Sequence, residues 1–273
     1  MTSRPQSLAT VVLLYDGGPS DEVMPQRIAL ALRASLMQQL HFPVRVEHVS
    51  LRSGSTLSGV IGDSRSAHAL CAVPLEPFWS RRAVELYRTA LLAAGDDDVP
   101  LLGGWQADGR FARAVAARAG EAMDGGRLDE TAVILAARSL PLVGLADDGY
   151  ADLVQRAAAH LVGVLMPGDW RLAYVQPAGA STADHLEPDG PSAVFQLAHE
   201  GWQTALVVPL GYAFDGEATA TDLDGALRRE VEGAGMSYHR ARAVNDSPVF
   251  IETLADVVIQ HLAQRPMEGH SHS

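Results

Sequence analysis

The sequence contains two similar apolar runs, each broken by a proline near its carboxyl end. Residues 69–75 read ALCAVPL, and residues 205–210 read ALVVPL. Because proline cannot donate to a sheet ladder, each run predicts a buried strand that ends where a loop begins. One copy lies late in each half of the chain. The pair therefore indicates two copies of one parallel-sheet unit, with two sets of strand ends meeting at a central cleft.

Short runs rich in Val, Ile and Leu alternate with longer amphipathic stretches. Strands are predicted at 10–15, 44–49, 69–75, 100–105, 131–137, 170–175, 204–210 and 237–243. Helices are predicted at 25–40, 80–94, 108–123, 150–166, 191–201, 219–234 and 248–263. This alternation implies parallel pairing, and strands that are apolar throughout imply sheets covered on both faces. The predicted fold class is α/β, with two similar doubly wound, Rossmann-type parallel-sheet domains facing a central cleft.

A polar, glycine-rich segment near the midpoint, DGGRLDE at 124–130, predicts a linker between the two halves. A chain of 273 residues fits two domains at about 150 residues each. We therefore expect an N-terminal domain at 1–126 and a C-terminal domain at 127–266. The tail at 267–273 contains two histidines, for which we prefer a disordered, solvated end over a metal site.

Composition excludes several classes of partner and cofactor. The net charge is −12 and no basic cluster is present, which argues against nucleic acid and anionic membranes as partners. The single cysteine, Cys71, lies in an apolar run and cannot supply an all-cysteine iron–sulfur site. No apolar run approaches the ~20 residues of a membrane helix, and the first residues lack a signal-peptide core. These features predict a cytoplasmic protein.

In doubly wound sheets, ligands bind beyond the carboxyl ends of the strands. Four loops should converge there: 16–25, 76–82, 138–141 and 211–224. The last loop is the richest in carboxylates, which are Asp215, Glu217, Asp222 and Asp224. On one helix face they would form an acidic track for a hydrated cation. The alternative is that acidic residues simply favour the positive end of a helix dipole.

Several segments resemble ferrochelatases of the class II chelatase superfamily, and most closely the coproporphyrin ferrochelatases of actinobacteria. They are LLYDGGPSDEVMP (13–25), DWRLAYVQPAG (169–179), HLEPD (185–189), ALVVPLGYAFDGEATATDLD (205–224) and NDSPVFIETLADVV (245–258). These matches follow the family order over most of the chain. The resemblance implies two similar chelatase-like domains, a tetrapyrrole ligand of heme or porphyrin biosynthesis, and a divalent metal such as iron as substrate rather than as resident cofactor.

The chain departs from the family pattern at the position of the metal-insertion histidine. The family sequence is similar to Ser-Ala-His-Ser/Gly-Leu-Pro, whereas residues 136–141 read AARSLP, so Arg138 replaces the histidine. A neutral histidine can ligate a metal or accept a pyrrole proton. An arginine stays charged and offers no lone pair, but it can clamp a carboxylate such as a porphyrin propionate.

A second departure lies in the family's Asp-His-Leu-Glu element. Here the same stretch reads Asp215-Gly216-Glu217-Ala218, so the histidine and the glutamate are both missing. Glu217 is a candidate stand-in one position early, although one residue rotates a helical side chain by about 100°. The long family segment that follows Met-Pro, which forms one lip of the porphyrin cleft, is also missing after Met24-Pro25.

The predicted site follows from these positions. The catalytic candidates are Arg138, Glu217 and Asp215. The substrate-binding candidates are Asp16, Ser20, Arg138, Ser139, His185 and Tyr212. The metal candidates are Asp222, Asp224 and Glu217. Ser20 and His185 occupy positions where the family often has an aromatic residue.

Three functions stay open. The first is a divergent chelatase-family protein, a pseudoenzyme without normal ferrochelatase activity, that binds a tetrapyrrole or another metal-chelating small molecule in the inter-domain cleft. The second is a non-catalytic partner or regulatory subunit derived from a ferrochelatase. The third is an active chelatase, a lyase, that uses rebuilt ligands on a non-standard substrate. Loss of a positioned proton acceptor typically costs 10²–10⁴-fold in rate, which argues against ordinary iron insertion.

Overall fold

The computed structural model describes residues 9–52, 54–65, 67, 69–123, 127–141, 149–177 and 185–264. The predicted tail at 267–273 and residues 124–126 of the predicted linker lie outside the described residues. The chain forms two compact units. One comprises Met1–Leu75, Glu85–Trp105 and Pro248–Ser273, and the other comprises Glu76–Val84 and Gln106–Ser247. None of the described helices is long and apolar enough to cross a membrane.

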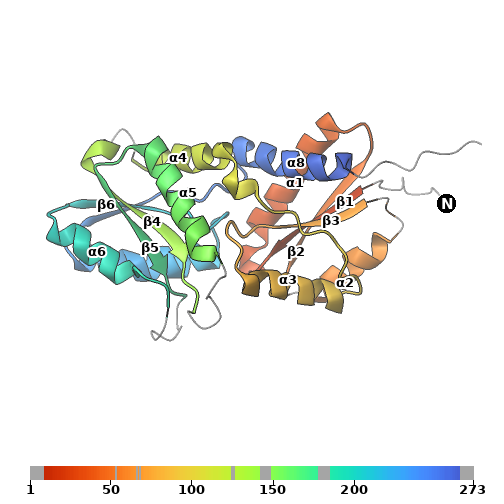
Figure 1. Ribbon diagram of the computed structural model, residues 1–273, viewed down its shortest axis with the longest axis horizontal. Helices are drawn as coiled ribbons and strands as arrows, with labels where there is room; N and C mark the ends of the chain where they lie inside the picture. Colours follow the sequence, from red (N-terminus) through yellow and green to blue (C-terminus); the bar gives the residue numbers. More distant parts are fainter. Residues whose placement is uncertain are drawn as a thin grey trace, which may run out of the picture. The chain divides into compact units, whose positions relative to one another are not determined.

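The first unit is built on a three-stranded parallel sheet in the order β2-β1-β3. Its strands are β1 (Ala9–Tyr15), β2 (Val44–Ser50) and β3 (Ala69–Pro74). Its helices are α1 (Val23–Gln39), α2 (Gly54–Asp63), most of α3 (Arg81–Ala93) and α8 (Pro248–Ala263) (Figure 1). A short 3₁₀ turn lies at Pro19–Asp21, and another, Trp105–Ala107, lies where the chain passes into the second unit. All seven residues of β1 are buried, as expected for a central parallel strand.

The predicted strand at 100–105 is wrong, because only a single bridge forms there. Ala72 of β3 pairs with Leu101, with the Leu102 N–H donating to the Ala72 carbonyl at 2.8 Å. The chain then turns at Gly104, whose φ of +86° is incompatible with a continuing strand. Helix α2 was not predicted, because its sequence GSTLSGVIGD is rich in residues with low helix propensity.

The second unit is built on a four-stranded parallel sheet in the order β5-β4-β6-β7. Its strands are β4 (Ala132–Arg138), β5 (Asp169–Val175), β6 (Thr204–Val208) and β7 (Ser237–Arg240). Its helices are α4 (Gly109–Met123), α5 (Tyr150–Leu165), α6 (Gly190–His199), the π-helix η4 (Thr219–Leu227) and α7 (Arg228–Gly233), with a 3₁₀ turn at Leu128–Glu130. Two parallel sheets flanked by helices confirm the predicted α/β fold class.

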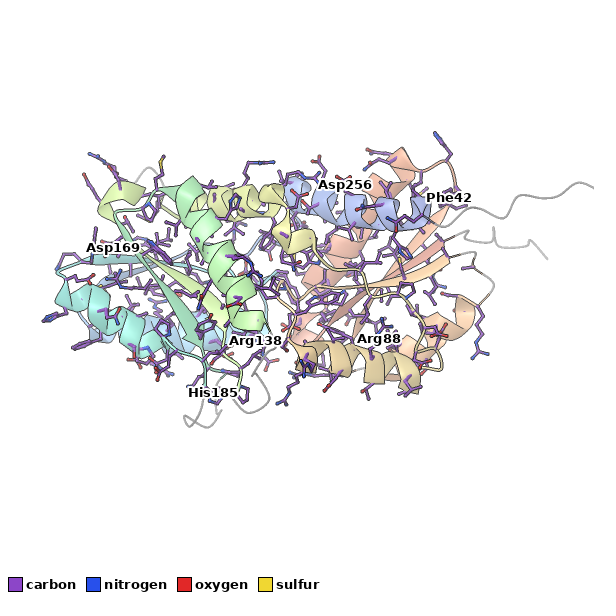
Figure 2. The ribbon with its side chains drawn as sticks, in the orientation of Figure 1. Phe42, Arg88, Arg138, Asp169, His185 and Asp256 are labelled. Carbon is purple, nitrogen blue, oxygen red and sulfur yellow. The ribbon has the colours of Figure 1, made fainter. Side chains whose placement is uncertain are left out.

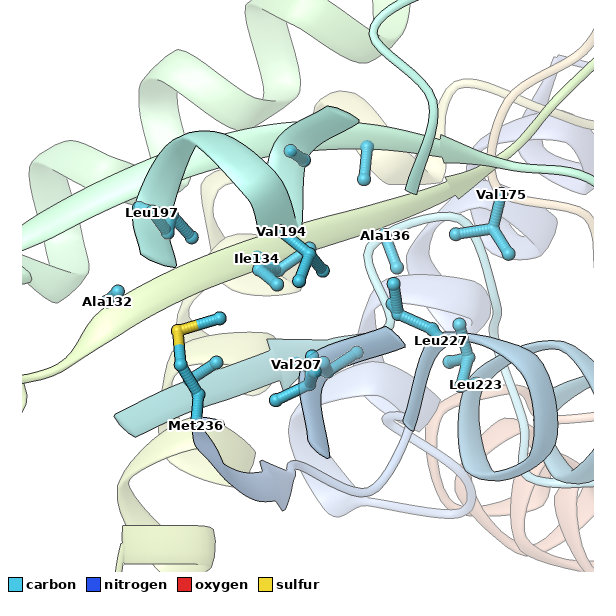
Figure 3. Packing of buried hydrophobic residues seen from close by; sticks show 14 of the residues in the cluster. Ala132, Ile134, Ala136, Val175, Val194, Leu197, Val207, Leu223, Leu227 and Met236 are labelled. Carbon is cyan, nitrogen blue, oxygen red and sulfur yellow. The ribbon is translucent and has the colours of Figure 1, made fainter. Parts of the chain in front are cut away.

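Alternate residues of β4 face different layers of the second unit. Ala132, Ile134 and Ala136 pack in one buried cluster with residues of α6, η4 and α7 (Figure 3). Because strand side chains alternate between faces, Arg138 leaves the strand on this same side. The sequence therefore places a charged residue at the end of a fully apolar row, where the sheet stops.

The grouping of helices differs from the predicted domain boundaries. Helix α4 packs against α5, β6 and β7 and so belongs to the second unit, although it precedes the predicted boundary. Helix α8 packs against α1 in the first unit, although it follows all the strands of the second. Each sheet is thus completed by a helix that a division at residue 126 assigns to the other half.

Candidate site at the carboxyl end of strand β4

Arg138 is the last residue of β4 and is partly buried (Figure 2). Toward the other described residues, its guanidinium makes no hydrogen bond and no ion pair. An arginine is charged at any physiological pH and carries five N–H donors. The end of β4 therefore carries an ionised side chain for which the described residues supply no carboxylate partner.

The backbone of β4 is held by unusual partners where β6 ends. The β4–β6 pairing stops at Leu135 opposite Val208, because Pro209 follows and has no N–H. Beyond this point the Gly211 N–H donates to the Ala136 carbonyl at 2.9 Å. The Tyr150 hydroxyl donates to the Arg138 carbonyl at 2.7 Å. Tyr150 thus takes the place of the missing strand at the residue that carries the charge.

Two buried phenols lie beside the Arg138 charge. Burial, and then the Glu76 carboxylate, raises the pKa of Tyr150 above its ordinary value, while Arg138 acts in the opposite direction. Burial, and then the Asp222 carboxylate, raises the pKa of Tyr212, which Arg138 again opposes. Both phenols therefore stay protonated at neutral pH and act as donors. The Tyr212 hydroxyl lies 3.4 Å from an oxygen of Asp222, which is itself 2% exposed.

Asp215 and Asp224 share one guanidinium. Nη1 of Arg240 lies 2.7 Å from Asp215, and its Nε lies 2.7 Å from Asp224. Burial alone would lower the pKa of Arg240, but the two carboxylates outweigh it and raise that pKa. Asp215 also accepts hydrogen bonds from the Asn245 amide and the Ala243 backbone N–H. This network ties the loop after β6, the π-helix and the end of β7 together.

The three metal candidates lie in three different environments. Glu217 is exposed, Asp222 is buried beside Tyr212, and Asp224 is bound by Arg240. Across the described ranges, no three His, Cys, Asp or Glu side chains are grouped closely enough to hold a metal ion. The expected stacking assumed 3.6 residues per turn, whereas residues 219–227 form a π-helix, which has wider turns. A metal role for these carboxylates stays a prediction.

Two further substrate candidates lie near Arg138: Ser139 follows it in the sequence, and His185 pairs with Pro141 just beyond it. Ser139 is 3% exposed, and its hydroxyl has no hydrogen-bond partner in the part of the chain that the structure describes. Its backbone N–H continues the ladder by donating to the Val175 carbonyl at 2.8 Å. His185 forms an antiparallel bridge with Pro141 and is labelled with Arg138 in Figure 2. Both residues thus flank the end of β4.

Asp16 and Ser20 belong to the first unit. Asp16 follows β1, is exposed, and pairs with Arg52 at 2.9 Å. Ser20 is exposed on the 3₁₀ turn Pro19–Asp21. The tight turn between them needs Gly17, where a Cβ would lie 2.7 Å from a carboxylate oxygen of Asp21. A substrate role for Asp16 and Ser20 stays a prediction.

Sequence reasoning missed the residues that position the site. Tyr150 opens α5 directly after Gly149, and no motif marks it. Arg240 and Asn245 lie in segments predicted as a strand and as a family-like stretch, without a role. The one signal for these two residues was their position in or near predicted buried strands. A polar side chain at such a position needs hydrogen-bond partners, which implies that acceptors lie nearby.

The ferrochelatase family model matches residues 23–262. Relatives include a ferrochelatase of Herpetosiphon aurantiacus, 28% identical over 67% of this chain and 63% of that protein. Coproporphyrin III ferrochelatases of Propionibacterium freudenreichii and Mycolicibacterium smegmatis are 31% and 30% identical, over 43% and 52% of this chain and 33% and 43% of their own lengths. The matched segment is thus less than two thirds of each of these relatives.

The fold is similar to that of solved chelatases. SirB from Bacillus subtilis aligns with a TM-score of 0.65 at 18% identity, over 94% of this chain and 96% of that one. CbiX, described as the terminal enzyme of siroheme biosynthesis in denitrifying bacteria, aligns with a TM-score of 0.62 at 18% identity, over 92% and 98%. The likeness shows a class II chelatase fold, and the match of the family model over residues 23–262 establishes that the chain belongs to the ferrochelatase family.

Proposed function

We propose that this ferrochelatase-family protein binds a carboxylate-bearing tetrapyrrole at the end of β4 and does not carry out ordinary iron insertion. The observation that carries the proposal is Arg138. It stands where the family pattern has its metal-insertion histidine, and among the described residues it has no carboxylate partner. A single buried cysteine needs no oxidising compartment, so we also propose that the protein is cytoplasmic.

The chemistry of the site supports binding more than metal insertion. Iron insertion requires an acceptor for the two pyrrole protons, and a guanidinium cannot accept them. Its fixed positive charge also opposes the approach of a divalent cation. Asp215 and Asp224 are both paired with Arg240, and Tyr212 donates to Asp222, so these three carboxylates are already engaged. A carboxylate of the ligand is the group that matches a guanidinium without a carboxylate partner among the described residues.

The first test is anaerobic insertion of ferrous iron into coproporphyrin III and protoporphyrin IX, followed by absorbance. We expect no insertion above the uncatalysed rate. Robust insertion by the purified protein would refute the loss of activity. An active family member assayed in parallel shows that the metal and porphyrin stocks are competent.

The second test is titration of metal-free coproporphyrin III, followed by Soret absorbance and fluorescence. Arg138→Ala should weaken binding by about 10- to 100-fold, since a hydrogen bond to a charged group contributes about 1.5–3 kcal/mol. Arg156→Ala is the matched control, because Arg156 is an exposed arginine on α5 of the same unit. Equal affinities for the wild type and Arg138→Ala would contradict the carboxylate clamp. Absence of any binding would favour the role of a protein partner.

A further inference from the structure

We infer that Tyr150 is a positioning residue for Arg138, so that the affinity for an anionic ligand depends on a phenol that never touches it. This inference rests on the proposed function of Arg138. Its basis is the 2.7 Å hydrogen bond from the Tyr150 hydroxyl to the Arg138 carbonyl. Tyr150 is 3% exposed and Arg138 is half-buried, so the bond is partly shielded from water.

The position of this bond in the sheet makes it consequential. On the β5 side, β4 is paired as far as Arg138 opposite Val175, but on the β6 side pairing ends at Leu135. Residues 136–138, which lead to the guanidinium, thus pair with a neighbouring strand on the β5 side only. The Tyr150 hydroxyl satisfies the Arg138 carbonyl on the other side, at a part-buried position where an unpaired carbonyl would cost stability.

The phenol is suited to this task rather than to proton transfer. Burial keeps Tyr150 protonated, so its hydroxyl is a constant donor at neutral pH. It belongs to the first turn of α5, and its backbone is fixed where that helix begins. A rigid donor that fixes the Cα of Arg138 reduces the conformational freedom which the guanidinium loses when a ligand binds.

The test is a double-mutant cycle with metal-free coproporphyrin III as the probe. Tyr150→Phe should weaken binding about fivefold to tenfold, equivalent to losing one buried hydrogen bond. In the Arg138→Gln background the same change should have no effect, because no guanidinium is left to position. Tyr174→Phe is the control, since the Tyr174 hydroxyl approaches the Ala151 carbonyl at 3.5 Å and not Arg138. It should change the affinity less than twofold.

A ligand-independent measurement separates this inference from the proposed function. Hydrogen exchange at the Ser139 amide, which donates to Val175, should be about tenfold faster in Tyr150→Phe and unchanged in Tyr174→Phe. If Arg138→Gln leaves the affinity unchanged, the proposed function fails, while the exchange result still decides the positioning role. If Tyr150→Phe leaves exchange at wild-type values, or weakens binding equally with and without Arg138, the inference is overturned. Placing p-aminophenylalanine at position 150 restores a donor and should restore the affinity.

Discussion

Asp16 of the first unit and Arg138 of the second occupy corresponding places in two similar sheets, yet they carry opposite charges. Leu13 and Leu135 lie opposite Val73 and Val208, the residues that precede the two prolines. Three residues further on, β1 leads to Asp16 and β4 leads to Arg138. One fold thus presents an acidic and a basic strand end at equivalent positions.

The surroundings of the two strand ends differ more than their charges. After β1 the chain turns at once through glycines, and Asp16 pairs with Arg52 in solvent. After β4 the backbone is held by Tyr150 and lies against Gly211, and the guanidinium is left without a described partner. The comparison shows that a repeated scaffold can pair the charge at one strand end and, among the described residues, leave the charge at the other without a counter-charge.

The two units should differ most in how much stability their ion pairs contribute. Arg240→Ala should lower the free energy of unfolding by about 3 kcal/mol or more, because it leaves two partly buried carboxylates without their counter-charge. Arg52→Ala should cost less than about 1 kcal/mol, since Arg52 and Asp16 are well exposed. Urea denaturation of both variants at pH 7 measures the difference. If Arg240→Ala and Arg52→Ala lowered the free energy of unfolding by similar amounts, the partly buried carboxylates of the second unit would tolerate the loss of their counter-charge as well as exposed Asp16 does.

The next contrast lies in the glycines that approach each strand end. Gly211→Ala should destabilise the protein by about 2–3 kcal/mol, because the new Cβ would lie 2.8 Å from the Cα of Ala137, in a backbone with little room to move. Gly17→Ala should cost less, about 1–2 kcal/mol, because the new Cβ would meet side-chain atoms of Asp21 and Tyr15 on a short turn rather than the backbone of a paired strand. Thermal unfolding checks the order, and a larger effect at Gly17 would reverse the comparison.

A smaller effect should appear at alkaline pH. Burial, followed by nearby groups, raises the pKa of Tyr150, Tyr212 and Tyr15 in the folded protein. Below pH ~10 both folded and unfolded states hold these protons, so the phenols do not change stability with pH. Above it the unfolded state releases them first, and stability falls by up to about 1.4 kcal/mol per pH unit for each phenol.

Urea denaturation between pH 9 and 11.5 measures this slope. The double variant Tyr150→Phe with Tyr212→Phe should show a shallower loss than the wild type, and Tyr15→Phe should reduce the slope by about half as much. An unchanged slope in the double variant would mean that these phenols ionise as readily in the folded state as in the unfolded chain.

The smallest effects on stability should come from the two strand-end charges themselves. Arg138→Gln and Asp16→Asn should each change the free energy of unfolding by no more than about 0.5 kcal/mol, because toward the described residues neither side chain has a buried bond to lose. A destabilisation above about 1.5 kcal/mol in Arg138→Gln would identify the guanidinium as part of the structural framework, and would count against its availability to a ligand.

Much of the fold could be predicted from local pattern. The apolar runs identified seven of the strands within a few residues, because fully buried parallel strands are apolar throughout. The prediction of a strand at 100–105 was wrong, because the chain turns at Gly104 after a single bridge. Helix α2 was missed because its glycines and serines hide a helix that tertiary packing stabilises.

Only those residues of the candidate site that lie at strand ends or in family-like motifs could be predicted from the sequence. Arg138, Tyr212 and Asp222 were selected from strand ends and from family-like motifs, and the structure places their charges and phenols close enough to affect one another. Tyr150 and Arg240 escaped notice, because a hydrogen bond across twelve residues and an ion pair across twenty-five leave no spacing signal. The acidic track was predicted from α-helical geometry that the π-helix does not follow.

The sequence by itself determined the two parallel sheets, the strand ends marked by Pro74 and Pro209, and the arginine at the end of β4. These depend on residue type and local periodicity, which a chain carries wherever it folds. Tertiary structure decided which charges are satisfied. Arg240 reaches Asp215 and Asp224, Arg52 reaches Asp16, and Arg138 reaches no described carboxylate. Pairing of charges is set by distances between segments far apart in the chain, so only the folded structure distinguishes a strand end whose charge is paired from one that has no carboxylate among the described residues.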